Sequence, residues 1–203
     1  MRLFTIGAVY FCGFFFGNLI TGLLGVAPEP AAMEWGRHLG PYGARILLGA
    51  GFALAAAAWA LRVWGGAYLR PDVVWNQNAL GDRLLVDGPL RYVRNPLYLA
   101  NVLLAAGAGL LAPPIGFAIV VAGNLLVVLG LMRVETRVLR ERYGATFDAY
   151  AAAVPALLPR LTPAHVSGTA RVTPSPGPAL RSEFFSAAIA LALLLLSILL
   201  PVR

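Results

Sequence analysis

Side chains that can bind a charged ligand gather at the ends of two neighbouring apolar runs. One group begins the first run and the other follows the second; the members are Arg91, Tyr92, Arg94, Asn95 and Tyr98, and then Arg133, Glu135, Arg137 and Arg140. Arginine binds a carboxylate or a phosphate, a glutamate binds an ammonium or a ribose diol, and an aromatic wall takes a base. The pattern favours a pocket for a zwitterionic ligand that carries an aromatic ring.

The same residues have a simpler interpretation. Arginines at the ends of membrane spans are ordinary snorkelling and topology residues, and Glu135 can pair with an arginine or face water. The residues by themselves leave both interpretations open.

Signatures of other cofactor and metal sites are missing from the sequence. It has no G-x-G-x-x-G after a strand and no G-x-x-x-x-G-K-[ST], which argues against a Rossmann or P-loop domain. The single cysteine, Cys12, lies in an apolar run, and His38 and His165 lie in separate polar segments without metal-ligand spacing. We expect no disulfide and no metal ion.

The composition is that of an integral membrane protein. Of the 203 residues 59% are hydrophobic and 12% are charged, and the mean hydropathy is +0.75. The net charge is +7 and every cation is arginine. In so apolar a chain this excess favours cytoplasmic loops that face anionic lipid, and no nucleic-acid partner is expected.

Five stretches are long and apolar enough, or nearly so, to form transmembrane helices of about 20 residues. They cover residues 3–26, 46–64, 96–112, 115–132 and 184–200. Pro113-Pro114 leaves room only for a tight turn, so the third and fourth form a hairpin whose ends return to the same interface. We predict an all-α integral membrane protein with about five transmembrane helices and a cytoplasmic helical segment after the fourth.

Arginine placement predicts the orientation. If the spans alternate, 13 arginines fall on the side of the N-terminus and 3 on the opposite side. The positive-inside rule puts the first set in the cytoplasm. We therefore expect an N-terminus and motif loops in the cytoplasm and a C-terminus on the opposite side, in a bacterial inner membrane.

The polar segments divide the chain further. Turn signals at Gly81-Asp82 and Asp87-Gly88-Pro89 flank a strand-like stretch at residues 84–86. Residues 133–161 are predicted as helix with a stop at Gly144 and a second short helix that ends before Pro155. Pro, Gly, Ser and Thr then predict a flexible linker at 162–181. We expect a membrane-embedded core at 1–161, with its motifs in 87–161, and an additional helix at 182–203.

Gly107-Ala108-Gly109 lies inside the third span. This position favours a close helix contact over a phosphate-binding loop.

Two stretches resemble a known family. They are "GPLRYVRNPLYLANVLLAAGAGL" and "VETRVLRERYGATFDAYAAAVPALLPRL", and they resemble the membrane methyltransferases around isoprenylcysteine carboxyl methyltransferase and phospholipid N-methyltransferase. The likeness covers about 87–161. It implies S-adenosylmethionine bound at the cytoplasmic ends of the helices, with cofactor-binding residues Tyr92, Arg94, Asn95, Pro96, Tyr98, Glu135 and Thr136.

This sequence departs from the family pattern at four positions. Leu90 replaces a tyrosine and Ala100 a glycine, Asn95 stands where the prenylcysteine enzymes have histidine, and Thr136 replaces the second of two glutamates. Leu139, Tyr143, Gly144, Phe147, Tyr150, Val154 and Pro155 keep the second motif.

The resemblance implies a methyltransferase that acts on a lipophilic acceptor, either a prenylcysteine-like carboxylate or a lipid, at the cytoplasmic face. A methyl donor of this kind carries its own leaving group, so the protein has to align the acceptor and exclude water. A carboxylate acceptor needs no base, and Arg140 or Arg91 can orient it as the catalytic residues. The acceptor is expected to enter from the bilayer. The alternatives are an NADPH-dependent sterol-type membrane reductase and a catalytically inactive membrane partner protein.

Overall fold

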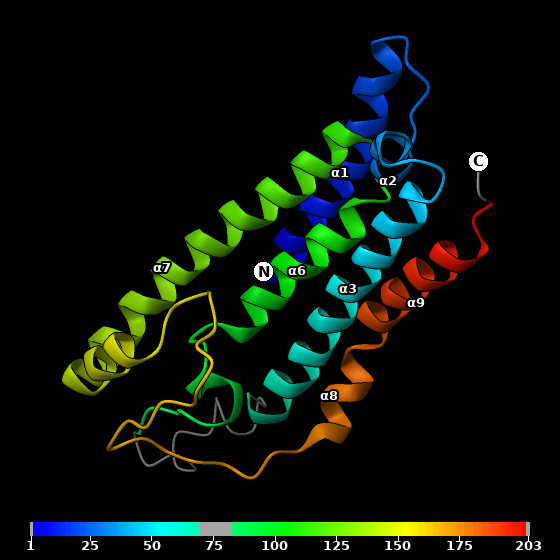
Figure 1. The fold of residues 1–203 in the computed structure, drawn as a ribbon. Helices are drawn as coiled ribbons and strands as arrows, with labels where there is room; N and C mark the ends of the chain where they lie inside the picture. Colours follow the sequence, from blue (N-terminus) through cyan, green and yellow to red (C-terminus); the bar gives the residue numbers. More distant parts are fainter. Residues whose placement is uncertain (1, 70–82, 202–203) are drawn as a thin grey trace. The chain divides into compact units, whose positions relative to one another are not determined.

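Helices make up most of the described chain. The computed structural model describes residues 2–69 and 83–201, with the backbone alone for residues 2–6. The elements in Figure 1 are α1 (Arg2–Leu23), α2 (Ala31–Gly36), the 3-10 helix η1 (Arg37–Leu39), α3 (Gly43–Tyr68), the 3-10 helix η2 (Gly88–Arg91), α6 (Pro96–Gly109), α7 (Pro114–Ala153), α8 (Pro176–Ser182) and α9 (Phe184–Leu199). In the described ranges, extended pairing is limited to one isolated bridge between Leu85 and Ala170. The all-α prediction is confirmed.

Apolar helices occupy all five regions where spans were predicted. Two of them, α3 and α7, are long and apolar enough to cross a membrane, and α8 with α9 passes the same test as a pair bent by 60°. The 14 residues of α6 extend about 21 Å, less than the hydrocarbon core of about 30 Å. The apolar part of α1, Gly7–Leu23, is also short. The chain is an all-α membrane protein with two or three full-length spans and two shorter apolar helices in its described part.

Internal contacts divide the chain into two compact units. The first comprises Met1–Trp59, Asn101–Leu129 and Phe185–Arg203, and the second comprises Ala60–Ala100 and Gly130–Phe184. All the candidate ligand-binding residues belong to the second unit.

Glycines let the helices of the first unit approach closely. A Cβ atom at Gly107 would lie 2.6 Å from the carbonyl oxygen of Gly51, and one at Gly17 would lie 2.6 Å from the Cα atom of Gly116. Small residues commonly line contacts between membrane helices, because the bilayer supplies no hydrophobic force between helices and close packing must replace it. The close contact predicted for Gly107-Ala108-Gly109 is confirmed at Gly107.

The second unit is built around a small apolar core. Its buried members come from the loop before α6, from the end of α7 and from the segment that follows; they are Leu84, Val86, Phe147, Tyr150, Val154 and Ala164. This core supports the segment that carries the first motif.

The helix α7 is kinked at Gly144. Its φ of 49° and ψ of −126° lie outside the helical region, in a conformation that only glycine adopts at low cost. The chain then resumes a helix as far as Ala153, and this short helix carries Phe147 and Tyr150 into the core. The predicted stop and the predicted second helix are confirmed.

Residues 162–181, predicted as a linker, contact the loop before α6. The amide of Ala170 donates to the carbonyl of Leu84 at 2.8 Å, and the amide of Ala164 donates to the carbonyl of Arg91 at 2.9 Å. Helix α8 begins within this segment and ends at Ser182, one residue beyond it. The predicted boundaries between core, linker and last helix stay predictions.

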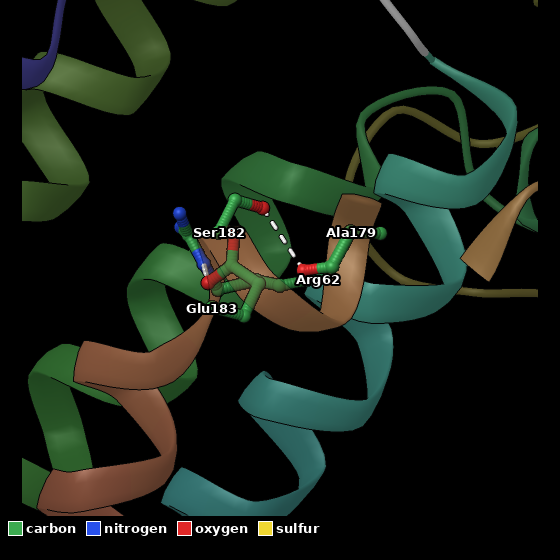
Figure 2. Close-up of polar contacts among 4 residues, drawn as sticks. All are labelled: Arg62, Ala179, Ser182 and Glu183. Atoms are coloured by element: carbon green, nitrogen blue, oxygen red, sulfur yellow. Dashed lines mark hydrogen bonds and ion pairs between the residues drawn. The ribbon is translucent and has the colours of Figure 1, made fainter. Parts of the chain in front are cut away.

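An ion pair, drawn in Figure 2, joins α3 to Glu183, the residue after α8. A close approach also joins α8 to α3. Arg62 Nε donates to Glu183 Oε2, with side chains that are only 19% and 12% exposed. The Ser182 hydroxyl donates to the carbonyl of Ala179 at 2.9 Å. A Cβ atom at Gly66 would lie 3.1 Å from the Cβ of Ala179, so a glycine allows this approach.

Candidate functional site

The turn at Asp87-Gly88-Pro89 leads into the first motif. Asp87 Oδ1 accepts a hydrogen bond from the Gly88 amide at 2.9 Å, and η2 follows. Gly88 has a φ of 53°, and a Cβ atom there would lie 2.5 Å from the ring of Tyr68, so the position requires glycine. The other predicted turn, at Gly81-Asp82, lies outside the described residues. Of the strand-like stretch at 84–86, Leu85 forms the bridge to Ala170.

Hydrogen bonds join the first motif directly to the second. The Arg94 amide donates to the carbonyl of Pro155 at 2.9 Å, and Asn95 Nδ2 donates to the carbonyl of Ala156 at 2.9 Å. Pro96 is the first residue of α6, where a missing N–H costs nothing. The segment that follows Val154 at the end of the second motif is therefore hydrogen-bonded to the residues just before α6.

Two arginines share one aromatic ring. The ζ carbons of Arg94 and Arg140 lie 5.9 Å and 5.8 Å from the centroid of the Phe147 ring, within the range of a cation–π contact. Arg140 is exposed, and its Nε donates to Asp148 Oδ1 at 2.8 Å. Arg94 Nε is buried, and within the described residues it has no hydrogen-bond partner. An acceptor atom is therefore missing beside Arg94.

Burial lowers the pKa of Arg94, and the positive charge of Arg140 lowers it further, whereas Tyr150 opposes the shift. The arginine remains a cation, because its ordinary pKa is above 12. A bound anion would replace the lost hydration of the buried cation and offset the repulsion from Arg140. This position therefore favours a carboxylate or a phosphate.

Tyr150 forms a hydrogen bond with the backbone of the first motif. Its hydroxyl donates to the carbonyl of Leu90 at 2.8 Å, and the side chain is buried. Burial raises the pKa of Tyr150, and the charge of Arg94 only partly opposes this shift. The phenol therefore stays protonated and keeps donating.

The remaining aromatic and apolar residues of the first motif lie close by in the chain. Tyr92 contacts Trp64, with ring centroids 5.7 Å apart, and its carbonyl accepts from the amide of Arg160 at 3.0 Å. Pro96 and Tyr98 are buried at the start of α6. They pack at the N-terminus of this helix.

Glu135 and Thr136 are half-buried on α7. Glu135 lies one helical turn before Leu139, so the two side chains share a helix face, and Leu139 packs against the core that contains Phe147 and Tyr150. The predicted meeting of these two residues with Arg94 and Asn95 stays a prediction.

Arg91 makes its contacts with a different segment. Its Nε donates to the carbonyl of Ala164 at 3.0 Å, and its Nη2 lies 3.0 Å from His165 Nε2. It lines a cavity of about 230 Å³ together with residues of 164–171. Arg140 instead contacts Phe147 and Asp148, so the contacts of the two predicted catalytic arginines involve separate groups of residues.

Some residues around these sites carry no local sequence signal. Asp148, Arg160 and His165 belong to no cofactor motif, and their partners lie 7 to 74 residues away in the chain. Phe147 and Tyr150 are part of the second motif, yet their contacts with Arg94 and Leu90 appear only in the folded chain.

Fold and site together define a class: an all-α membrane protein with a cationic, aromatic-lined site between the start of one helix and the end of the next. The family described as phospholipid methyltransferase matches residues 41–146, just over half of the chain, and the chain belongs to this family. No curated protein and no solved structure matches the chain.

The matched region runs from the start of α3 to just beyond Gly144. It includes every predicted cofactor residue and both predicted catalytic arginines. The predicted resemblance is confirmed. Of the three predicted functions, family membership supports the first, a membrane methyltransferase that acts on lipids.

Proposed function

We propose that this protein transfers a methyl group from S-adenosylmethionine to a lipophilic acceptor at the cytoplasmic face of the membrane. The observation that carries the proposal is the buried Arg94 Nε, which has no partner in the described chain and lies beside the Phe147 ring. Family membership supports the methyl-transfer chemistry.

The residues present fit the proposed cofactor in three respects. Arg94 offers a hydrogen-bond donor to a carboxylate. Glu135 offers a carboxylate for an ammonium or a ribose diol, and Thr136 adds a hydroxyl where relatives have a second glutamate. Asn95 uses its amide nitrogen on Ala156, which leaves its Oδ1 as an acceptor.

Tyr92, Pro96 and Tyr98 are proposed as the apolar wall of the cofactor site. Two of them are buried, which suits the exclusion of water from a methyl-transfer site. Bound S-adenosylmethionine would supply a methyl group on a sulfonium that already carries its leaving group.

The acceptor is proposed to be a lipid or a prenylcysteine-like carboxylate. Arg140 is exposed at the Phe147 ring and is proposed to orient an acidic group of the acceptor. Arg91, whose guanidinium is held by Ala164 and His165, is proposed as a second orienting residue. A carboxylate acceptor is favoured, because no base is then required.

The proposed location is a bacterial inner membrane, with the N-terminus and the motif segments in the cytoplasm and the C-terminus on the opposite side. The asymmetric distribution of arginine supports this orientation.

Calorimetric titration of the purified full chain with S-adenosylhomocysteine tests the proposal. Wild type is expected to bind, and Arg94→Gln and Glu135→Ala are expected to bind about tenfold or more weakly, because each loses a charge-assisted contact. Arg142→Gln is the matched control, because Arg142 is exposed on the same helix as Glu135 and is not one of the candidate ligand-binding residues.

Absence of binding by wild type, or equal binding by Arg94→Gln and Arg142→Gln, would refute the cofactor assignment. Binding of NADPH in its place would favour the reductase.

A further inference from the structure

The cavity beside Arg91 has a marked positive lining. It measures about 230 Å³, and its polar lining residues are Arg91, His165, Ser167, Thr169 and Arg171. The buried side chain of Val86 contributes an apolar surface. No carboxylate lines the cavity, and in the described chain neither arginine forms an ion pair with one.

The Arg91 guanidinium is held in place before any ligand binds. Its Nε donates to Ala164 O at 3.0 Å, and its Nη2 contacts His165 Nε2 at 3.0 Å. Because arginine has only donors, His165 Nε2 must accept, which puts the imidazole proton on Nδ1. The guanidinium loses less rotamer freedom when it binds a ligand, since part of its position is already determined.

The nearest acidic side chain in the sequence binds backbone amides and does not line the cavity. Asp87, the closest acidic residue in the sequence, accepts from the Gly88 amide at 2.9 Å and from the Val172 amide at 3.2 Å. Thr169 donates its hydroxyl to the carbonyl of Val166 at 2.8 Å, so it can only accept from a ligand. Ser167 therefore supplies the hydroxyl donor.

Backbone contacts hold the two walls together. Ala164 N donates to Arg91 O at 2.9 Å, and Ala170 N donates to Leu84 O at 2.8 Å. The two bonds lie on either side of residues 165–169, so both ends of this loop are attached to the segment that contains Leu84 and Arg91.

We propose that this cavity binds a phosphate group, either free or carried by a lipid headgroup. Two guanidiniums from separate segments and a serine hydroxyl supply more donors than one carboxylate can use, and they suit a tetrahedral oxyanion with three or more acceptor oxygens. The volume of about 230 Å³ lies below the range of about 300–1,000 Å³ for drug-sized ligands, so a nucleoside cofactor does not fit here. Phosphate binding requires no methyl donor, so it can be tested apart from the proposed methyl transfer, with which the cavity shares Arg91.

The test uses the purified full chain in an uncharged detergent, without any methyl donor. One titration adds inorganic phosphate, and the other adds dihexanoyl phosphatidic acid, each followed by calorimetry. Arg171→Gln and the double variant Arg91→Gln/Arg171→Gln are compared with Arg181→Gln, an equal loss of charge at an exposed arginine on α8 that lies outside the cavity. A thermal unfolding curve for each variant verifies that it is folded.

We expect Arg171→Gln to bind about tenfold more weakly and the double variant not to bind measurably, whereas Arg181→Gln stays within about twofold of wild type. Binding of inorganic phosphate identifies free phosphate as a sufficient ligand. Binding of the lipid alone identifies a headgroup. The proposal is overturned if wild type binds neither probe, or if Arg171→Gln binds as tightly as Arg181→Gln.

Discussion

At the scale of single residues, the second motif acts as a support for the first. Tyr150 donates to Leu90 O, and Phe147 lies under the guanidiniums of Arg94 and Arg140. The core that contains Phe147 and Tyr150 is almost fully buried. The position of the cationic residues therefore depends on aromatic residues more than 50 positions away from Arg94 in the sequence.

Tyr150→Phe is expected to lower the free energy of unfolding by about 1–2 kcal/mol, because it removes a buried hydrogen bond and leaves the Leu90 carbonyl unsatisfied. Denaturant unfolding in detergent measures the change. Tyr143→Phe is the control on the same helix and should stay within about 0.5 kcal/mol of wild type. Equal effects of the two substitutions would show that the Tyr150 hydroxyl contributes nothing specific.

The raised pKa of Tyr150 also predicts that the free energy of unfolding falls at alkaline pH. Burial raises the folded-state pKa above the ordinary tyrosine value, which is near 10. The stability that this group contributes is therefore complete below pH about 10 and falls as the pH rises further, because the unfolded chain releases the proton first. The stability difference between wild type and Tyr150→Phe should narrow as the pH rises above about 10, and a constant difference would contradict the assignment.

At the scale of helices, a kink and an ion pair shape the second unit. Gly144 turns the end of α7 into a separate short helix that carries Phe147 and Tyr150. Arg62 and Glu183 join α3 to the residue after α8, with little exposure of either side chain. Both features position elements around the candidate site without taking part in its chemistry.

Gly144→Ala is expected to destabilise the protein by about 1–3 kcal/mol. The reason is conformational alone, since nothing lies within 4 Å of the added Cβ. Gly130→Ala is the matched control on the same helix, where the added Cβ is also unobstructed; in a regular helix it should stabilise by about 0.5–1 kcal/mol. Unfolding free energies that change in the same direction for both would contradict the backbone explanation.

A double-mutant cycle with Arg62→Gln and Glu183→Gln is expected to give a coupling energy of about 0.5–3 kcal/mol, because the pair is largely shielded from water. The control cycle uses Arg37 and Glu29, whose side chains are 62% and 46% exposed and should couple by less than about 1 kcal/mol. Coupling that is no larger for the shielded pair would assign the α3–α8 contact to packing at Gly66 instead.

At the scale of the whole molecule, apolar helices and an uneven distribution of arginine define the protein's relation to the membrane. Two or three of the described helices satisfy the requirements of a full span, and residues 41–146 place the chain among the phospholipid methyltransferases. The proposed orientation puts both motifs on the side where a soluble methyl donor is available.

Cysteine labelling tests this orientation. In a Cys12→Ala background, Thr173→Cys and Ala27→Cys each place a thiol at an exposed position, one after the motif region and one between α1 and α2. A membrane-impermeant maleimide should label Thr173→Cys in inverted vesicles and Ala27→Cys in right-side-out vesicles. Labelling of both from the same side would rule out the proposed topology.

The sequence alone predicted the features that depend on neighbouring residues. The apolar runs gave the helices, Pro113-Pro114 gave the hairpin, and Gly144 gave the kink, because hydrophobicity and backbone freedom act locally. The arginines beside Asn95 and the second motif were sufficient to indicate the family that residues 41–146 confirm.

Tertiary structure alone decided which groups meet. The contact of Arg91 with His165 spans 74 residues, and the bond from Asn95 to Ala156 spans 61. No periodicity or spacing encodes such pairs, since they arise when distant segments bury a shared core around Phe147 and Val154. The buried Arg94 Nε and the cavity beside Arg91 follow from that burial, because only the folded chain removes water from one arginine and gathers others around a common space.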